Sequence, residues 1–162
     1  MDYKRVLTAE EIKTISELAY LLFPLDYGAY VRKNHINYFL EKYQSEEAIA
    51  EQIENGYEYF LLSEKGEVSG YFGFEIMGER LKLCKLYFLV NVRNRGLGHQ
   101  AMTWLKEYAI EKGCKQLELS VLLENKKAIR FYERLGYRTA GIYEVQFKTG
   151  YSETNYRMEQ SI

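Results

Sequence analysis

Residues 86–101, LYFLVNVRNRGLGHQA, combine an apolar run, a glycine-rich turn and the beginning of a helical pattern. The apolar run at residues 86–90 predicts a strand in the middle of a sheet. Beyond the turn, apolar residues recur every three or four positions, which predicts an amphipathic helix closed by Gly113. The residues of this apolar face are Leu97, Ala101, Trp104, Leu105, Tyr108 and Ala109.

The turn itself, residues 93–98 with the sequence RNRGLG, has the features of a phosphate-binding loop. Its glycines permit close approach of the backbone to a ligand, and the start of the next helix offers unpaired N–H groups. Arg93 and Arg95 add local positive charge. Neither the P-loop nor the dinucleotide fingerprint fits, because the first requires Gly-Lys-Ser/Thr and the second a glycine where Ala101 stands. The turn predicts a phosphate or pyrophosphate ligand, with a plain strand-to-helix turn as the alternative.

The flanking sequence predicts one α+β domain over residues 1–162, built around a mixed sheet. Thr8 and Glu11 have the spacing of a capping box, and we expect the helix they begin to end before Pro24. Residues 117–123 alternate as a strand, so the order strand–helix–strand implies a parallel crossover. Further helices are expected after Val31, after Ser45 and from Asn125. Further strands are expected at residues 57–63, 68–76 and 81–90. Residues 142–147 and 155–158 are expected to form a final hairpin.

Composition excludes several classes of function. The 162 residues include 22 basic and 23 acidic side chains, a formal charge of −1, so no overall positive field favours nucleic acid or anionic lipid. No apolar run reaches the roughly 20 residues of a membrane span. The first residues are too acidic for a signal peptide, so we expect a cytoplasmic protein with no membrane partner. Two cysteines and two histidines are too few for a disulfide framework or a metal site.

A second motif, NKKAIRFYERLGY at residues 125–137, follows a predicted strand. Together the two motifs resemble the acyl-CoA-binding half of the GCN5-related N-acetyltransferase (GNAT) family. Arg93, Gly96 and Gly98 match that family's Arg/Gln-x-x-Gly-x-Gly/Ala pattern. Residues 125–137 match its Asn-x-x-Ala-x-x-Phe-Tyr-x-x-x-Gly-Phe/Tyr pattern at every stated position. The resemblance covers residues 81–137.

The resemblance implies a mostly antiparallel central sheet flanked by helices, in which a splayed parallel strand pair forms a cleft for acetyl-CoA. Backbone N–H groups of the turn would bind the pyrophosphate, and the strand before it would pair with the pantetheine arm and polarise the thioester. Asn125 and Ala128 would contact the same arm. The implied cofactor residues are Tyr87, Phe88, Leu89, Arg93, Asn94, Arg95, Gly96, Leu97, Gly98, His99, Asn125, Ala128 and Tyr132.

The resemblance also implies a direct attack of an amine on the thioester, with Tyr132 protonating the departing CoA thiolate. A phenol of pKa about 10 suits that role, and core packing is the alternative for this tyrosine. Many family members place a glutamate on the strand before the phosphate loop, where this chain has Lys82, Cys84 and Lys85. Glu75 on the neighbouring strand is the best substitute base, and a relay through water is the alternative base. The alternative role for Glu75 itself is that of a solvated strand residue.

Residues near the end of the first predicted helix offer groups that could bind the acceptor. Asp26 offers an anion and Tyr27 and Tyr30 offer cation-binding rings, which favours a small cationic, polyamine-like amine. A peptide N-terminus, a protein lysine, an amino acid and an aminoglycoside stay open, and packing of the tyrosines is the alternative role. Because the strand carboxylate is missing, a non-catalytic acyl-CoA sensor or partner domain also stays open, as does a nucleotide-binding protein. A tyrosine-rich surface and the frequency of dimers in the family would suit a homodimer.

Overall fold

The computed structural model describes residues 1–162, which form two compact units. The first unit contains residues 1–74 and 85–97, and the second contains residues 75–84 and 98–162. The chain therefore passes from one unit to the other three times.

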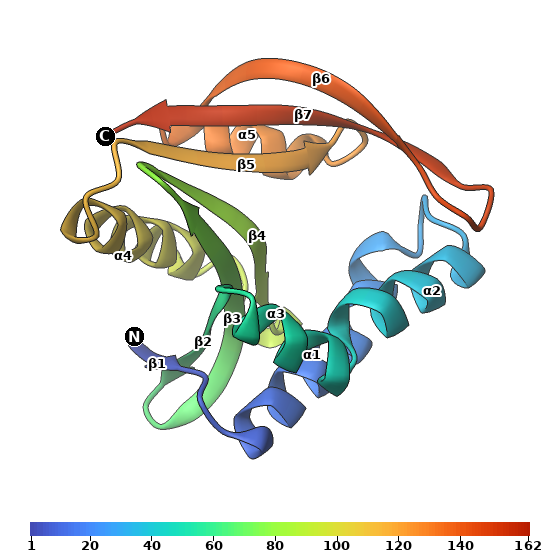
Figure 1. Cartoon of the computed structure of the whole chain (residues 1–162), viewed down its shortest axis with the longest axis horizontal. Coiled ribbons are helices and arrows are strands. Elements are labelled where there is room, and N and C mark those ends of the chain that lie inside the picture. The colour runs from blue at the N-terminus through green and yellow to red at the C-terminus, as the bar shows by residue number, and fades with distance from the viewer. The chain divides into compact units, whose positions relative to one another are not determined.

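The elements of the chain form one mixed sheet with flanking helices, drawn in Figure 1. The sheet has seven strands in the order β1-β2-β3-β4-β5-β7-β6. Its pair β4–β5 is parallel, whereas β1–β2, β2–β3, β5–β7 and β6–β7 are antiparallel, which confirms the predicted fold class. The bounds are β1 Asp2–Arg5, α1 Ala9–Tyr27, α2 Lys33–Gln44, α3 Glu46–Glu54, β2 Glu58–Glu64, β3 Glu67–Met77, β4 Arg80–Phe88, the 3-10 helix η1 Val90–Val92, α4 Leu97–Glu111, β5 Gln116–Leu122, α5 Lys126–Arg134, β6 Arg138–Gln146 and β7 Ser152–Ser161.

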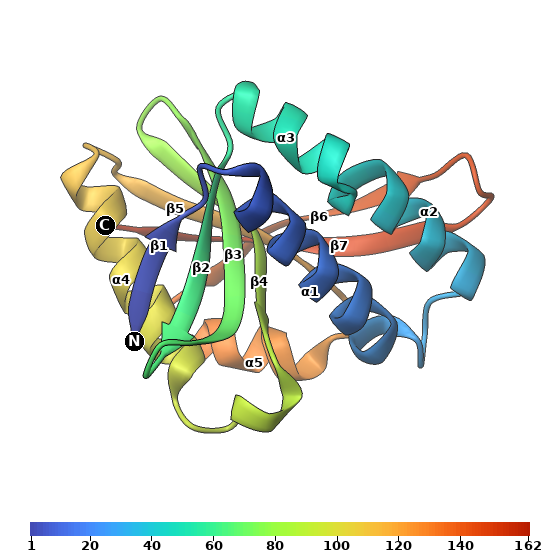
Figure 2. The same ribbon diagram turned by 90° about the horizontal axis from the view of Figure 1, so that it is seen from below.

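The first unit packs α1, α2 and α3 against one another and carries β1, β2 and β3 side by side (Figure 2). Large aromatic side chains on β2 and β3 are fully buried, among them Tyr59, Tyr71 and Phe72. Buried hydroxyl groups need partners, and Gln44 provides one, because its amide donates to Tyr59 and its carbonyl accepts from Tyr71. This network fixes the end of α2 against the strands.

Helix α1 begins as predicted but does not end as predicted. Thr8 and Glu11 form the complete capping box. The expected end before Pro24 is wrong, since the helix continues to Tyr27 with Pro24 inside it. Proline removes one N–H donor and opposes the previous turn, yet here the next turn is held by tertiary contacts of Asp26 and Tyr27. The carbonyl that loses its helical partner belongs to Tyr20, which is an exposed residue that water can reach.

Strand β1 was not predicted from the sequence. It has only four residues, three of them exposed, and its DYKR sequence shows no apolar alternation. It is an edge strand whose hydrogen bonds to β2 come from the backbone, so side-chain pattern carries no signal for it.

The second unit contains the parallel ladder and the predicted C-terminal hairpin. Residues Arg80 to Leu83 of β4 pair with Gln116 to Leu119 of β5. Strand β7 lies between β5 and β6, and α5 covers one face of these strands (Figure 1). On β5, Glu118 is buried and forms ion pairs with Arg80 and Arg157, at 3.7 and 3.2 Å. Because a buried carboxylate needs such compensation, the pairs tie three strands of this unit together.

No helix of the chain is long and apolar enough to cross a membrane.

Candidate functional site

The glycine-rich turn lies where the chain passes from the first unit to the second, between β4 and α4. Asn94 and Gly96 adopt left-handed backbone conformations, with φ of 62° and 79°. Left-handed residues in a turn that leads into a helix N-terminus are typical of anion-binding loops. Asn94, Arg95 and Gly96 are exposed, so a ligand can reach their backbone.

The two glycines of the turn are required for different physical reasons. A Cβ on Gly96 would meet no atom within 4 Å, so its glycine is needed for the positive φ alone. A Cβ on Gly98 would lie 3.2 Å from the ring of Phe131 on α5, so there the missing side chain makes room for packing. The first motif thus depends on the second motif through Phe131.

Arg93 does not point into solvent as a bare cation. Its Nη1 and Nη2 atoms donate to the two carboxylate oxygens of Asp26 at 2.8 and 3.0 Å. Its Nε atom donates to the Phe88 carbonyl at 2.9 Å. Arg95 lies 3.4 Å from the Glu64 carboxylate and stays more exposed. Of the two predicted cations of the turn, Arg93 is therefore neutralised by an internal partner.

The end of β4 is closely held within the first unit. The Leu89 N–H donates to the Ser69 carbonyl at 2.8 Å. The Tyr87 side chain lies among the rings of Phe23 and Tyr71, and its hydroxyl lies 2.6 Å from the hydroxyl of Tyr27. Burial is the main cause that raises the pKa of Tyr87 well above its usual value. Tyr87 therefore stays protonated at neutral pH and acts as a hydrogen-bonding anchor.

The second motif begins with a cap made by its own asparagine. The Asn125 Oδ1 atom accepts from the Ala128 N–H at 3.2 Å and so begins α5. The amide nitrogen is the other hydrogen-bonding group of this side chain. Capping alone accounts for an asparagine at this position, with no ligand needed. The cap also sets the direction of the amide nitrogen.

Tyr132 lies half-buried on α5, with its ring against Phe131 and Tyr137 at centroid distances of 5.2 and 5.7 Å. Burial raises the pKa of Tyr132 to about 12. Burial also raises the pKa of Tyr137, with a smaller contribution from the neighbouring Tyr132. Both phenols therefore stay neutral through the physiological range.

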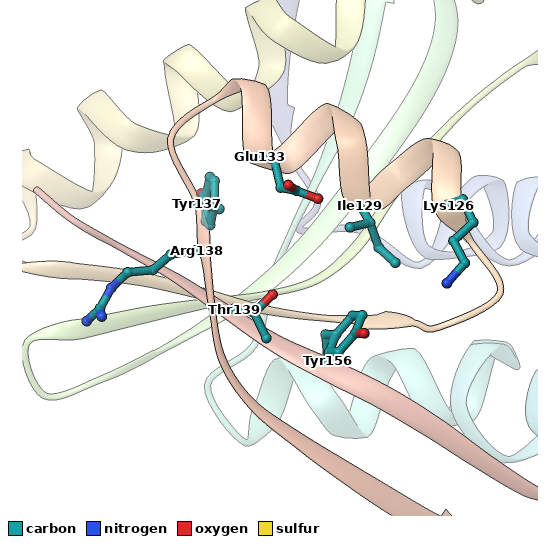
Figure 3. A pocket seen from close by; sticks show the side chains of 7 residues that line it. All are labelled: Lys126, Ile129, Glu133, Tyr137, Arg138, Thr139 and Tyr156. Carbon is teal, nitrogen blue, oxygen red and sulfur yellow. The ribbon is translucent and has the colours of Figure 1, made fainter.

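A pocket of about 680 Å³ lies on another face of α5, shown in Figure 3. Lys126, Ile129 and Glu133 reach it from the helix, and Tyr156 reaches it from β7. The remaining lining residues are Tyr137, Arg138 and Thr139. It includes none of the predicted cofactor residues of α5, so the pocket and the predicted cofactor contacts use different sides of the helix.

The predicted acceptor residues come from the last turn of α1 and the segment after it. Tyr27 and Tyr30 form an edge-to-face pair with centroids 6.0 Å apart, and Tyr30 is exposed. Asp26 lies beside them in sequence, but Arg93 engages both of its carboxylate oxygens. The anion expected for an amine therefore already has a strong internal partner.

Glu75, the predicted base, lies half-buried on the part of β3 that belongs to the second unit. Its role stays a prediction. No group of three or more His, Cys, Asp or Glu side chains is placed to hold a metal ion. The bond from β4 to Ser69 and the packing of the motif residue Phe131 against Gly98 were not predicted, because contacts between residues distant in sequence leave no spacing signal.

The model of the Acetyltransferase (GNAT) family matches residues 23–137, more than half of the chain. The chain belongs to the GNAT acetyltransferase family. The match includes both motifs and extends back into α1, beyond the residues 81–137 that carry the two motifs and the strand before them.

Curated relatives match part of this GNAT chain. Thialysine N-epsilon-acetyltransferase of Sus scrofa is 38% identical over 61 residues, which cover 38% of this chain and 36% of that protein. The enzyme of the same name from Bos taurus is 34% identical over 86 residues, covering 47% and 51% of the two chains. The chain thus spans about a third to a half of the length of these relatives.

Solved GNAT structures share the whole fold. The PaiA N-acetyltransferase of Thermoplasma acidophilum, crystallised with coenzyme A, has a TM-score of 0.81 at 16% identity, with 100% of both chains covered. The ribosomal-protein-S18-alanine N-acetyltransferase of Escherichia coli has a TM-score of 0.70 at 20% identity, covering 99% of this chain and 94% of its own. At these identities the likeness establishes the fold alone.

Proposed function

We propose that this GNAT chain transfers an acetyl group from acetyl-CoA to a primary amine by direct attack. The observation that carries the proposal is the turn at residues 93–98, whose left-handed Asn94 and Gly96 lead into the N-terminus of α4. A helix N-terminus with such a turn binds phosphate groups, and acetyl-CoA carries a pyrophosphate. Membership of the acetyltransferase family supplies the chemistry that the turn alone does not specify.

Coenzyme A is proposed to bind through the backbone more than through charge. The N–H groups of residues 94–99 receive the pyrophosphate, and Arg95 is the cation of the turn with the more exposed side chain. The β4 backbone at residues 87–89 and the side of α5 that carries Asn125 and Ala128 receive the pantetheine arm. Because the Leu89 N–H donates to Ser69, we assign the arm's donor to the Phe88 N–H.

Tyr132 is proposed to protonate the thiolate as CoA departs. With a pKa of about 12, its phenol is fully protonated at neutral pH, as an acid must be. The burial that raises the phenol pKa also raises the proton affinity of a thiolate formed beside it, so the two groups stay matched. Glu75, directly or through water, is proposed to accept the proton of the attacking amine.

The acceptor is proposed to be a small molecule with a primary amine, with cationic and polyamine-like amines favoured. The rings of Tyr27 and Tyr30 would attract the cation, since the Asp26 carboxylate is already paired with Arg93. The names of the relatives describe acetylation of thialysine at Nε, which supports a small amine and favours amino acids among the open candidates.

The decisive experiment measures release of free CoA from acetyl-CoA over a panel of polyamines, thialysine and other amino acids, aminoglycosides and short peptides. A thiol reagent detects the product, and a reaction without acceptor corrects for hydrolysis. Acceptor-dependent release establishes the transferase and names the acceptor class. No release across the panel, with acetyl-CoA binding measured by calorimetry, would contradict small-molecule transfer and favour the acyl-CoA sensor.

A further inference from the structure

The peptide unit between Phe88 and Leu89 is held at both of its ends. Its carbonyl accepts from the Arg93 Nε atom at 2.9 Å, and its N–H donates to the Ser69 carbonyl at 2.8 Å. A peptide with both polar groups engaged cannot rotate without breaking a hydrogen bond. The orientation of the end of β4 is therefore set by Arg93 on one side and by β3 on the other.

Arg93 can hold this carbonyl because Asp26 holds Arg93. The pair is bidentate, with distances of 2.8 and 3.0 Å, and both side chains are largely shielded, at 32% and 20% exposure. Bidentate pairs of arginine and carboxylate are among the strongest and most directional side-chain interactions in proteins. A second tie runs from the next residue of α1, since the Tyr27 hydroxyl bonds the Tyr87 hydroxyl.

We propose that Asp26 and Arg93 form a positioning pair that orients the backbone of β4 for acetyl-CoA without contacting the cofactor. The proposal rests on the proposed function. Successive N–H groups of a strand point to opposite edges, so fixing the Leu89 N–H toward β3 directs the Phe88 N–H to the other edge. Since small misplacements of a positioned group cost large factors in rate, the pair matters to the reaction from outside the reacting atoms.

The same contacts argue against the alternative that Arg93 binds phosphate directly. The guanidinium has five N–H donors, and those that face Asp26 and Phe88 are already in place. Its positive charge is matched by a carboxylate at hydrogen-bonding distance. Releasing it to a phosphate would leave a shielded Asp26 without its cation, which is costly.

The experiment compares Asp26→Asn, Arg93→Lys and the double variant. Lysine keeps the charge of Arg93 but lacks the planar fork, so a positioning role predicts that it fails. Each single variant is expected to lower kcat/KM for acetyl-CoA by about tenfold, and the double variant by no more than either alone, as for two members of one unit. Arg5→Lys serves as the matched control, because the Arg5–Glu58 pair at 3.4 Å also lies in the first unit, away from the turn.

A second readout does not depend on turnover. Amide hydrogen exchange at Leu89 is expected to rise about tenfold in both single variants and to stay unchanged in the control, because the peptide loses its carbonyl anchor. Unchanged exchange at Leu89 in both variants would overturn the proposal. It would also be overturned if Asp26→Asn tightened acetyl-CoA binding, since that result means that Asp26 restrains a phosphate-binding Arg93.

Failure of the proposed function gives a different result. In that case the wild-type chain releases no CoA with any amine. The variants are then compared by their affinity for acetyl-CoA, measured by calorimetry, in place of kcat/KM. The positioning pair then requires that both single variants weaken binding alongside faster exchange at Leu89, and equal binding by all variants would contradict it.

Discussion

Burial gives Tyr132 the protonation state that its proposed role requires, and the prediction at this residue is direct. We expect Tyr132→Phe to lower kcat by about 100-fold, because the leaving thiolate loses its acid, while acetyl-CoA affinity stays nearly the same. The ring packing against Phe131 and Tyr137 is retained by phenylalanine. Steady-state kinetics with calorimetry checks both parts. An unchanged kcat would remove Tyr132 from the chemistry.

Glu75 supports a prediction in which pH separates catalysis from structure. If Glu75 accepts the proton of the amine, Glu75→Gln should lose activity mainly at low pH, where unprotonated amine is scarce. The measurement is kcat/KM for the acceptor from pH 6 to 9. A loss of the same size at every pH would point to a structural effect of the substitution.

The two glycines of the phosphate turn should respond differently to alanine. Gly96→Ala places a side chain at φ of 79°, which costs roughly 1 kcal/mol or more of stability and distorts the turn. Gly98→Ala meets only the Phe131 ring at 3.2 Å and should cost less. Gly113→Ala is the matched control, since its φ of 82° carries the same strain at the end of α4.

Urea unfolding and acetyl-CoA titration separate these cases. Gly96→Ala should lose both stability and affinity, whereas Gly113→Ala should lose stability alone. Equal affinities of these two variants would show that the left-handed turn does not bind the cofactor.

The sequence predicted the candidate residues better than their partners. The spacing of the motifs identified Arg93 and Gly98 but not the reason for either, because Asp26 and Phe131 are distant in sequence. The sequence predicts an acceptor role for Asp26, since a carboxylate near tyrosines suits a cation. Its pairing with Arg93 depends on how α1 packs near β4, which no local pattern encodes.

At the scale of elements, the start of α1 carries a prediction about acid. The Glu11 Oε1 atom accepts from the N–H groups of Leu7 and Thr8, and its Oε2 atom lies 2.9 Å from Lys4. These bonds lower the pKa of Glu11 from 4.5 to about 2, and the bond from the Leu7 N–H has the largest effect. The folded state therefore binds this proton less tightly than the unfolded state, so its stabilisation is present above pH 4.5 and is lost toward pH 2.

Glu11→Gln should accordingly lower the free energy of unfolding by about 1 kcal/mol at pH 7 and by less as the pH falls below 4.5. Urea unfolding across this range provides the measurement. Glu17→Gln is the control, because Glu17 pairs with Lys13 only at 3.9 Å with both side chains exposed. A deficit of Glu11→Gln that stayed constant down to pH 3 would contradict the assigned pKa.

Helices were the elements best predicted from sequence. The misplaced end of α1 and the missed strand β1 have the same physical cause, whereas the strand expected over residues 81–90 ends at Phe88, before the 3-10 helix at Val90. Caps and apolar periodicity are local signals, and they located the start of α1 and the extent of α4 and α5. Pro24 inside α1 and the four-residue β1 both depend on tertiary partners. The contacts of Asp26 and Tyr27 continue the helix past Pro24, and β2 provides the hydrogen bonds of β1.

For the whole molecule, buried phenols predict the response to alkali. Burial raises the pKa values of Tyr71, Tyr87, Tyr132 and Tyr137 above the usual 10.0. Above pH 10 the unfolded chain releases these protons while the folded chain keeps them, so the free energy of unfolding falls as pH rises. Below pH 10 these groups contribute no pH dependence.

We therefore expect the contribution of these four phenols to stability to be level up to about pH 10 and to decline steeply beyond it. A pH titration that follows tyrosinate absorbance and, in parallel, circular dichroism of the fold checks this decline. The buried phenols should titrate only as the structure unfolds. Titration of all 16 tyrosines near pH 10 with the fold intact would contradict their burial.

The position of β7 between β5 and β6 also matters while the chain is being synthesised. Strand β6 leaves the ribosome before β7, and its partner in the sheet is β7. Until residues 152–161 emerge, β5 and β6 both lack the strand that pairs with them, so their backbone hydrogen-bonding groups stay open to other chains. The second unit thus completes its sheet late in translation, and nascent chains that stop before Ser152 should depend on chaperones.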